Sequence, residues 1–316
     1  MLPLVVIVGP TAAGKTGISV DLALALDGEI ISGDSMQVYR YMDIGTAKIK
    51  PAERKGIPHH LIDIKDPDET FSVAEFQALA EQKIREIAQR GKLPILVGGT
   101  GLYIQSVIDK YTFTEQKGII EYRKRLHLSA KEKGNKFLHD RLALVDPEAA
   151  SRIHINDLKR IVRALEYYCV TGRPISENKE AYERNYMSKY RAVLIGLTLE
   201  RKNLYEKINL RVDKMMEEGL LEEVRTLIRM GYTDSLAMQG LGYRQLLGYL
   251  RNEYDLAAAV ELIKRDTRRF AKRQLTWFRR DPRIHWFNVE NYNDYSQLLL
   301  EIKSKVGRTI GNHVEY

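Results

Sequence analysis

Eight residues near the start of the chain have the types and spacing of a phosphate-binding loop. The pattern G-x-x-x-x-G-K-T is formed by Gly9, Pro10, Thr11, Ala12, Ala13, Gly14, Lys15 and Thr16. The glycines let the backbone turn so that successive N–H groups point into one concavity, where an anion binds. Lys15 supplies a mobile positive charge for an outer phosphate, and Thr16 supplies a hydroxyl for a magnesium ion. The loop alone does not select the phosphate compound, although nucleotide binding, with ATP as the ligand, is the first expectation from the motif.

The elements on either side must hold this loop at the end of a strand. The apolar run 4–8 predicts a buried strand before the loop, and the pattern over 18–26 predicts a helix after it. That order is the one a phosphate-binding loop requires, and the helix adds the positive end of its dipole. A chance match in a glycine-containing turn is the alternative, and these flanks disfavour it.

Two further strand ends carry polar groups. The strand 29–32 leads to Asp34, and the strand 93–97 leads to a Gly-Gly-Thr sequence ending at Thr100, without a carboxylate. We expect Asp34 near the loop, because the carboxyl ends of parallel strands meet at one edge of a sheet. The missing acid after 97 weakens the interpretation as a nucleotide hydrolase. Asp34 is then a metal ligand, a general base or only a turn former, and the Gly-Gly-Thr sequence presents a hydroxyl or only makes a tight turn.

Alternating strands and helices predict the fold class. Ser72 and Glu75 form a capping box that starts a helix over 73–90, between the second and third strands. The connection over 40–65 shows weak periodicity and reads as a long irregular segment. We expect an α/β fold with a P-loop NTPase-like parallel sheet flanked by helices on both faces.

A charged, mainly helical stretch interrupts this pattern. We expect an inserted helical domain over 112–190, and a core domain formed by 1–111 and 191–316. The further expected elements of the core are a strand over 191–197, helices over 201–217 and 256–280, a strand over 284–287 and a helix over 294–305.

Basic side chains crowd the expected helix 256–280. They are Lys264, Arg265, Arg268, Arg269, Lys272, Arg273, Arg279 and Arg280. Several repeat at four-residue spacing, so the positive charge forms a broad band, and like charges at this spacing cost stability unless an anion compensates. A solvated basic face is the ordinary explanation, but contact with a nucleic acid backbone is favoured.

Composition sets the remaining bounds. The chain has 316 residues, 44% hydrophobic content and a formal net charge of +8, so it can bury a large core and admits a polyanionic partner. A single cysteine, Cys169, permits no internal disulfide, fits the reducing cytoplasm and reads as a core residue. The apolar start reads as a core strand, and no stretch is long enough to span a membrane. His59 and His60 lack a third ligand at recognisable spacing, which argues against a metal site.

These motifs together resemble the tRNA dimethylallyltransferase family, in its bacterial form. The resemblance covers the chain from end to end and rests on GPTAAGKT at 9–16, GDSMQVYR at 33–40, GGTGLY at 98–103, RIHINDLKRIVRALE at 152–166, LGYRQ at 241–245 and KRQLTWFR at 272–279. It implies that the ligand of the loop 9–16 is dimethylallyl diphosphate, bound with Mg²⁺, and that Thr11, Thr16 and Arg211 contact the diphosphate.

The resemblance also implies roles toward tRNA. Asp34 matches the general base that takes a proton from the adenine N6 amine, and Thr100 assists Asp34. The adenine must flip out of its stack in the tRNA to reach these two side chains. The implied tRNA contacts are Asp34, Ser35, Met36, Gln37, Thr100, Arg123, Lys159, Arg160, Ile161, Val162, Arg163, Gln239, Gly240, Leu241, Gly242, Tyr243, Arg244, Lys272, Arg273, Gln274, Leu275, Thr276, Trp277, Phe278 and Arg279.

The resulting hypothesis is a cytoplasmic, monomeric, magnesium-dependent transferase. It alkylates N6 of the adenine 3′ to the anticodon in certain tRNAs with a dimethylallyl group and releases diphosphate. One alternative is a P-loop small-molecule or nucleoside kinase in which Asp34 is the base or a metal ligand. Another is a nucleic-acid-binding protein whose loop 9–16 is a regulatory anion site.

Overall fold

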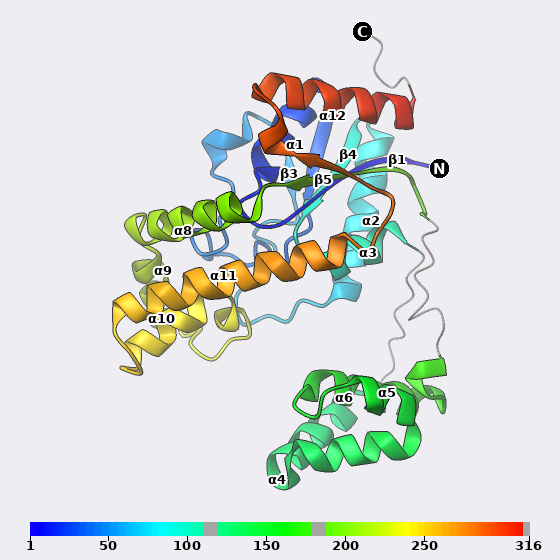
Figure 1. Ribbon diagram of the computed structural model, residues 1–316, viewed down its shortest axis with the longest axis vertical. Coiled ribbons are helices and arrows are strands. Elements are labelled where there is room, and N and C mark those ends of the chain that lie inside the picture. Colours follow the sequence, from blue (N-terminus) through cyan, green and yellow to red (C-terminus); the bar gives the residue numbers. More distant parts are fainter. Residues whose placement is uncertain (110–118, 178–187, 312–316) are drawn as a thin grey trace. The chain divides into compact units, whose positions relative to one another are not determined.

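A parallel six-stranded sheet forms the centre of the larger of two compact units, which comprises Met1–Tyr111 and Met187–Tyr316. The computed structural model describes residues 1–109, 119–177 and 188–311. The strands follow the order β3-β2-β4-β1-β5-β6, and each neighbouring pair is parallel (Figure 1). Their bounds are β1 Pro3–Val8, β2 Gly28–Ser32, β3 His59–His60, β4 Leu93–Gly98, β5 Arg191–Thr198 and β6 Ile284–Asn288.

Helices cover both faces of this sheet. Val5 and Ile7 of β1 belong to the core cluster that contains the buried faces of α1 and α12, whereas Leu4, Val6 and Val8 belong to the cluster of α2 and α3. Successive side chains of a strand point to opposite faces, so a continuous apolar run is required here. The predicted parallel sheet with helices on both faces is confirmed. The helices are α1 Lys15–Ala25, α2 Val73–Gln89, α3 Gly101–Ile108 and α12 Tyr295–Ile310.

The start of α2 shows one half of the predicted capping box. The hydroxyl of Ser72 accepts from the backbone N–H of Glu75 at 3.1 Å. The carboxylate of Glu75 instead forms an ion pair with Lys65 at 2.9 Å. The cap is therefore made, but the reciprocal bond of the box gives way to a tertiary contact.

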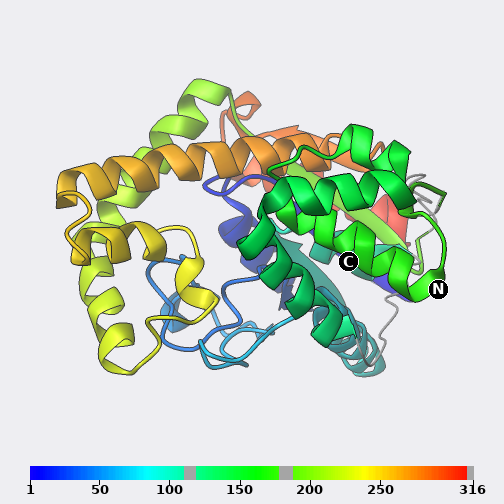
Figure 2. The same ribbon diagram turned by 90° about the horizontal axis from the view of Figure 1, so that it is seen from below.

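A third core cluster lies at the amino-terminal end of α11, where α9 and α10 pack (Figure 2). Its buried side chains include Leu220, Val224 and Leu227 of α9, whose three- and four-residue spacing gives one apolar stripe. Sequence reasoning did not recognise α9. These helices are α8 Arg201–Glu217, α9 Leu220–Arg229, α10 Tyr243–Leu250 and α11 Leu256–Phe278, with the short turn η3 Ala237–Gln239 before α10 and η4 Val289–Asn291 before α12.

The connection 40–65 was wrongly expected to be wholly irregular. It contains the short helix η1 Pro51–Arg54 and the strand β3, which pairs in parallel with Ile30 and Ile31 of β2. A two-residue edge strand made of His59 and His60 carries no apolar alternation. The sequence therefore lacks the alternation that would have predicted a strand, although His60 contacts the carboxylate of Glu29 in β2 at 2.7 Å.

The smaller unit, Thr112–Tyr186, is helical in the part that the structure describes. Buried side chains from α4 and α6, among them Leu126, Leu138 and Leu165, form its core. Gly134 has φ +82° and bends α4. The segments 112–118 and 178–187 of the predicted insertion lie outside the described residues. The elements are α4 Ile119–Val145, α5 Pro147–Arg152, α6 Leu158–Thr171 and η2 Ile175–Glu177.

Cys169 does not belong to the core of this unit, contrary to the prediction, because its side chain is exposed. The buried residues of α6 end at Glu166. The apolar neighbours of Cys169 in the sequence lie on the last turn of the helix, beyond the part that packs against α4.

The two places where the chain leaves and re-enters the larger unit are adjacent. Asp109 and Ser188 form an antiparallel bridge, and the N–H of Lys189 donates to the carbonyl of Ile108 at 2.9 Å. The carboxylate of Asp109 also binds Arg283 at 2.7 Å, and the side chain of Asp109 is buried. The insertion therefore begins and ends at one fixed point of the core.

Candidate active site at the carboxyl edge of the sheet

The loop between β1 and α1 has the backbone of an anion site. Gly9 has φ +146°, and a Cβ at this position would approach the carbonyl oxygen of Leu197 to 2.5 Å, so only glycine fits. Gly14 has φ +87° and caps α1 without a side-chain hydrogen bond. The first N–H groups of α1, at Lys15 and beyond, thus remain directed at the loop cavity, together with the positive end of the helix dipole.

Two cations, Lys15 and Arg211, lie beside this loop. The ammonium of Lys15 donates to the carbonyls of Gly9 at 3.0 Å and Pro10 at 2.8 Å, and the guanidinium of Arg211 donates to the hydroxyl of Thr11 at 3.0 Å. Burial, followed by repulsion from Arg211, lowers the pKa of Lys15 to about 8, and Asp34 opposes the change. Burial also lowers the pKa of Arg211. Two buried positive charges that repel each other favour the binding of a multiply charged anion between them.

Asp34 lies where the end of β2 meets these cations, and it is the group that opposes the pKa decrease at both Lys15 and Arg211. Its Oδ1 accepts from the N–H of Met36 at 2.8 Å, which fixes the carboxylate in a local turn. Thr100 lies alongside, since its Oγ1 accepts from the N–H of Ser35 at 3.3 Å. The structure thus brings together the loop 9–16, Asp34, Thr100 and Arg211.

Gln37 is held by its surroundings on both ends of its amide. The Oε1 atom accepts from the hydroxyl of Ser32 at 3.1 Å, and Nε2 donates to the carbonyl of Thr46 at 3.2 Å and that of Ala47 at 3.4 Å. The orientation of Gln37 therefore depends on the loop that carries Thr46 and Ala47.

Glu223 of α9 fixes that loop, and sequence reasoning missed it. Its carboxylate accepts from the N–H groups of Asp43, Ile44 and Gly45 at 2.9, 2.7 and 3.1 Å. The hydroxyl of Tyr243 donates to the same carboxylate at 2.7 Å. Three successive N–H groups aimed at one point make a small anion site, which the protein fills with its own glutamate.

The turn before α10 lies against the site. A Cβ on Gly240 would approach Cε of Met36 to 2.6 Å, so the stretch 239–244 borders the segment of Asp34. Within the stretch, Gln239 and Arg244 are exposed, whereas Tyr243 is buried.

Five of the residues implied as tRNA contacts have buried side chains and act in packing instead. Ile161 and Val162 fill the core of the smaller unit, and Phe278 packs under the sheet. Tyr243 contacts Glu223, and Gln274 reaches into the loop 9–16. Helix phase directs these side chains to the interior, and contact between their stretches and tRNA stays a prediction.

The smaller unit presents its basic residues around a buried acid. Arg123 binds Glu166 through Nε and through Nη2, the latter at 3.0 Å, and Arg163 lies 3.9 Å from the same carboxylate. Lys159 and Arg160 are exposed on the first turn of α6. Glu166 thus anchors the base of this cationic surface.

The basic band of α11 is partly neutralised by the protein itself. Asp266 binds Arg265 at 3.0 Å, Arg269 at 3.6 Å and Arg244 of α10 at 3.1 Å. Lys264 binds Asp213 at 2.7 Å. This correction to the predicted uncompensated band leaves the positive surface concentrated toward the end of α11. Its exposed members there include Lys272, Arg273 and Arg279.

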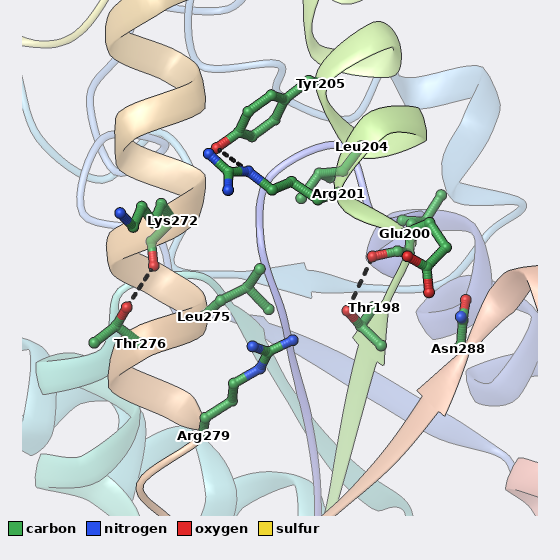
Figure 3. Close-up of a pocket in the computed structure, with 11 residues that line it drawn as sticks. Thr198, Glu200, Arg201, Leu204, Tyr205, Lys272, Leu275, Thr276, Arg279 and Asn288 are labelled. Atoms are coloured by element: carbon green, nitrogen blue, oxygen red, sulfur yellow. Dashed lines mark hydrogen bonds between the residues drawn. The ribbon is translucent and has the colours of Figure 1, made fainter.

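A pocket of about 340 Å³ adjoins this end of the helix (Figure 3). It lies beyond the ends of β5 and β6, and Lys272, Leu275, Thr276 and Arg279 line it from α11. Opposite them, Arg201 of α8 donates to the hydroxyl of Tyr205 at 3.2 Å. The three-, four- and seven-residue spacing from Lys272 places this face of α11 away from Gln274.

The sequence matches the model of the family described as IPP transferase over residues 37–281. The chain belongs to the IPP transferase family. It is 58% identical to the tRNA dimethylallyltransferase of Carboxydothermus hydrogenoformans over 287 residues, which are 90% of this chain and 91% of that protein. It is 52% identical to the tRNA dimethylallyltransferase of Bacillus cereus over 95% of this chain and 94% of the relative.

Solved structures of IPP transferase relatives have the same fold. The tRNA isopentenylpyrophosphate transferase of Bacillus halodurans superposes with a TM-score of 0.74 at 47% identity, covering 98% of each chain. A eukaryotic dimethylallyltransferase acting on tRNA superposes with a TM-score of 0.81 at 29% identity, covering 96% of this chain and 79% of that one.

The described residues of this IPP transferase form neither a metal-binding cluster of acidic, histidine and cysteine side chains nor a membrane-spanning helix. Among the described residues, no group of three or more His, Cys, Asp and Glu side chains is placed to hold a metal ion. Of the helices within residues 1–109, 119–177 and 188–311, none has the length and apolar character needed to cross a membrane.

Proposed function

We propose that the protein transfers a dimethylallyl group from dimethylallyl diphosphate to N6 of the adenine 3′ to the anticodon in tRNA. The observation that carries the proposal is the placement of one carboxylate, Asp34, beside two desolvated cations that line a phosphate-binding loop. Membership of the IPP transferase family and the printed names of its relatives support it. The acceptor is polyanionic, which agrees with the exposed cations near the end of α11.

The loop side of the site stabilises the leaving group. As the allylic C–O bond breaks, negative charge grows on the diphosphate, and the loop N–H groups, Lys15 and Arg211 face that charge. In the free protein these cations bond to oxygens of the loop itself, so they lie at the site and would exchange those bonds for the diphosphate oxygens.

Asp34 provides the base. The N6 amine of adenine must lose a proton as its nitrogen bonds to the allylic carbon, and the Asp34 carboxylate accepts that proton. The N–H of Met36 holds one oxygen of this carboxylate, and Thr100 orients the neighbouring backbone at Ser35. Gln37, clamped at both ends, lies on the same turn and supports the contacts with the flipped base.

The donor set fits a magnesium ion bound mainly through the substrate. Mg²⁺ commonly takes one or two protein oxygens and completes its shell with phosphate oxygens and water. Thr16 would supply its hydroxyl, and the ion would add positive charge to the leaving diphosphate.

A kinase is the less favoured function. A P-loop kinase or hydrolase ordinarily places an acid after the strand beside the loop to hold magnesium. Here β4, the neighbour of β1, ends in Gly98 and is followed by Gly99 and Thr100. The kinase hypothesis would therefore have to rely on Asp34 alone as its metal ligand or base.

The deciding experiment incubates the protein with labelled dimethylallyl diphosphate, Mg²⁺ and unmodified tRNA. We expect label to appear in tRNA that has adenine directly 3′ to the anticodon, and not in the same tRNA with guanine there. Conversion of ATP to ADP that depends on a small hydroxyl acceptor and phosphorylates it, with no labelling of any tRNA, would establish the kinase instead.

A further inference from the structure

The side chain of Gln274 joins the two halves of the site. Its Oε1 accepts from the backbone N–H of Thr11 at 2.9 Å, and its Nε2 donates to the carbonyl of Gly99 at 3.0 Å. Gln274 is 6% exposed, so both bonds are shielded from water. One amide thus spans the gap between the phosphate-binding loop after β1 and the turn after β4.

Each end of this bridge continues into a reacting group. On one side, Thr11 also accepts from Arg211 through its hydroxyl, so its backbone and side chain are both fixed. On the other side, Gly99 precedes Thr100, whose hydroxyl accepts from the N–H next to Asp34. A path of hydrogen bonds and backbone links therefore runs from Arg211 and Thr11, through Gln274, Gly99 and Thr100, to the backbone next to Asp34.

The turn after β4 makes close contact with Gln274 and Trp277 of α11 at two glycines. A Cβ on Gly99 would come within 2.1 Å of Nε2 of Gln274, and a Cβ on Gly101 would come within 2.2 Å of Cδ1 of Trp277. Both glycines let α11 approach the turn after β4, and this approach carries the amide into place. At both glycines a side chain larger than hydrogen would therefore displace Gln274 or Trp277.

We propose that Gln274 is a positioning residue. It sets the distance between the diphosphate held by the loop and the two side chains on the general-base side of the site, Asp34 and Thr100. Its earlier assignment as a direct tRNA contact came from the surrounding stretch 272–279 and not from its own exposure. The inference rests on the proposed transfer reaction. It predicts an effect on the chemical step at saturating tRNA, with tRNA affinity unchanged.

Gln274→Met tests the proposal, because methionine has a similar length and volume but neither hydrogen bond. We expect kcat to fall about 10- to 100-fold, since small displacements of reacting groups cost rates of this order. The affinity for inorganic diphosphate, measured by calorimetry, should fall as well because the loop loses its anchor at Thr11. The tRNA dissociation constant should stay at the wild-type value.

Gly99→Ala provides an independent variant, since its methyl group displaces the amide of Gln274 while leaving that residue in place. It should reproduce the loss of kcat. Glu261→Gln, a change of an exposed residue on the same helix, is the control and should retain wild-type values.

The outcomes separate the inference from the proposed function. A raised tRNA dissociation constant with unchanged kcat in Gln274→Met would overturn the positioning role and restore a direct contact. Unchanged kcat and diphosphate affinity, with only a lower melting temperature, would overturn it in favour of packing. Absence of transfer by the wild-type protein would count against the function itself, whereas the diphosphate affinities would still report on the bridge.

Discussion

Arg211 donates a hydrogen bond to the hydroxyl of Thr11 at 3.0 Å, across 200 residues of sequence. This contact brings α8 to the phosphate-binding loop and places a second cation beside Lys15. Sequence reasoning had no reason to select Arg211 apart from the family resemblance. Its position supplies the first of five predictions.

Arg211→Ala should weaken binding of inorganic diphosphate by about 10- to 100-fold, because a hydrogen bond to a charged group contributes about 1.5–3 kcal/mol. Isothermal titration calorimetry measures the change. Lys202→Ala removes an exposed cation from the same helix and serves as the control. Equal affinities of the Arg211 and Lys202 variants would remove Arg211 from the site.

Asp34→Asn should lower the rate of transfer to tRNA by about 100- to 10,000-fold, the usual contribution of a general base. Asparagine keeps the oxygen that accepts from Met36, so the turn and the tRNA affinity should persist. Asp68→Asn, at an exposed acid, is the matched control. Single-turnover transfer rates measure the effect. Equal rates for Asp34→Asn and Asp68→Asn would contradict the assignment of Asp34 as the general base.

Diphosphate affinity should fall as the pH rises through about 8. The pKa of Lys15 is lowered to about 8 in the free protein, so its ammonium is present below that pH and is lost above it. A bound anion favours the charged form, and binding should therefore take up protons on the alkaline side. Calorimetry in buffers of different ionisation enthalpy measures this uptake.

Lys15→Arg is the control for that pH series, because its guanidinium stays protonated throughout the range. Its diphosphate affinity should depend less on pH than that of the wild type. An identical pH profile for both proteins would assign the titration to the ligand or to another residue.

Glu223→Ala should lower the free energy of unfolding by about 2 kcal/mol, since it removes the acceptor of three N–H groups and of the buried Tyr243 hydroxyl. Urea denaturation measures the change. Glu222→Ala, which breaks only exposed ion pairs with Arg225 and Arg229, should cost less than about 1 kcal/mol. A Glu223 variant as stable as the Glu222 variant would show that the loop 43–45 does not depend on this carboxylate.

Arg273→Gln should weaken tRNA binding and lower the slope of log affinity against log salt by about 0.7–0.9, the value for one phosphate contact. Arg273 is exposed near the end of α11. Lys264→Gln is a suitable comparison, because Lys264 already binds Asp213 and should release fewer counterions. Filter binding at several salt concentrations measures both slopes, and a larger change for Lys264 would contradict the assignment.

Local patterns were sufficient for every strand of the sheet except β3 and for the first half of the site. The apolar run before Gly9 and the topology of parallel strands place Lys15 and Asp34 at one edge, and the structure agrees. Glu223 and Gln274 gave no such signal. Each is a single polar residue in a helix, and its role arises only when that helix packs against a loop from a distant part of the chain.

The sequence of the basic helix α11 likewise did not show which of its positive charges are paired with acids. Its spacing predicted a continuous band, but Asp213 and Asp266 lie where they bind several of its members. Asp213 comes from another helix, so counting charges along α11 overestimated the positive surface.

The bridge between Asp109 and Ser188 has a consequence for how this chain can be re-engineered. Because exit and re-entry are adjacent, a short connection can join them, and the entropic cost of a longer excursion grows only slowly with its length. A short turn or a foreign domain can therefore replace the helical unit without moving the ends of the core that it joins. Lys15, Asp34, Thr100 and Arg211 all belong to the part that would remain.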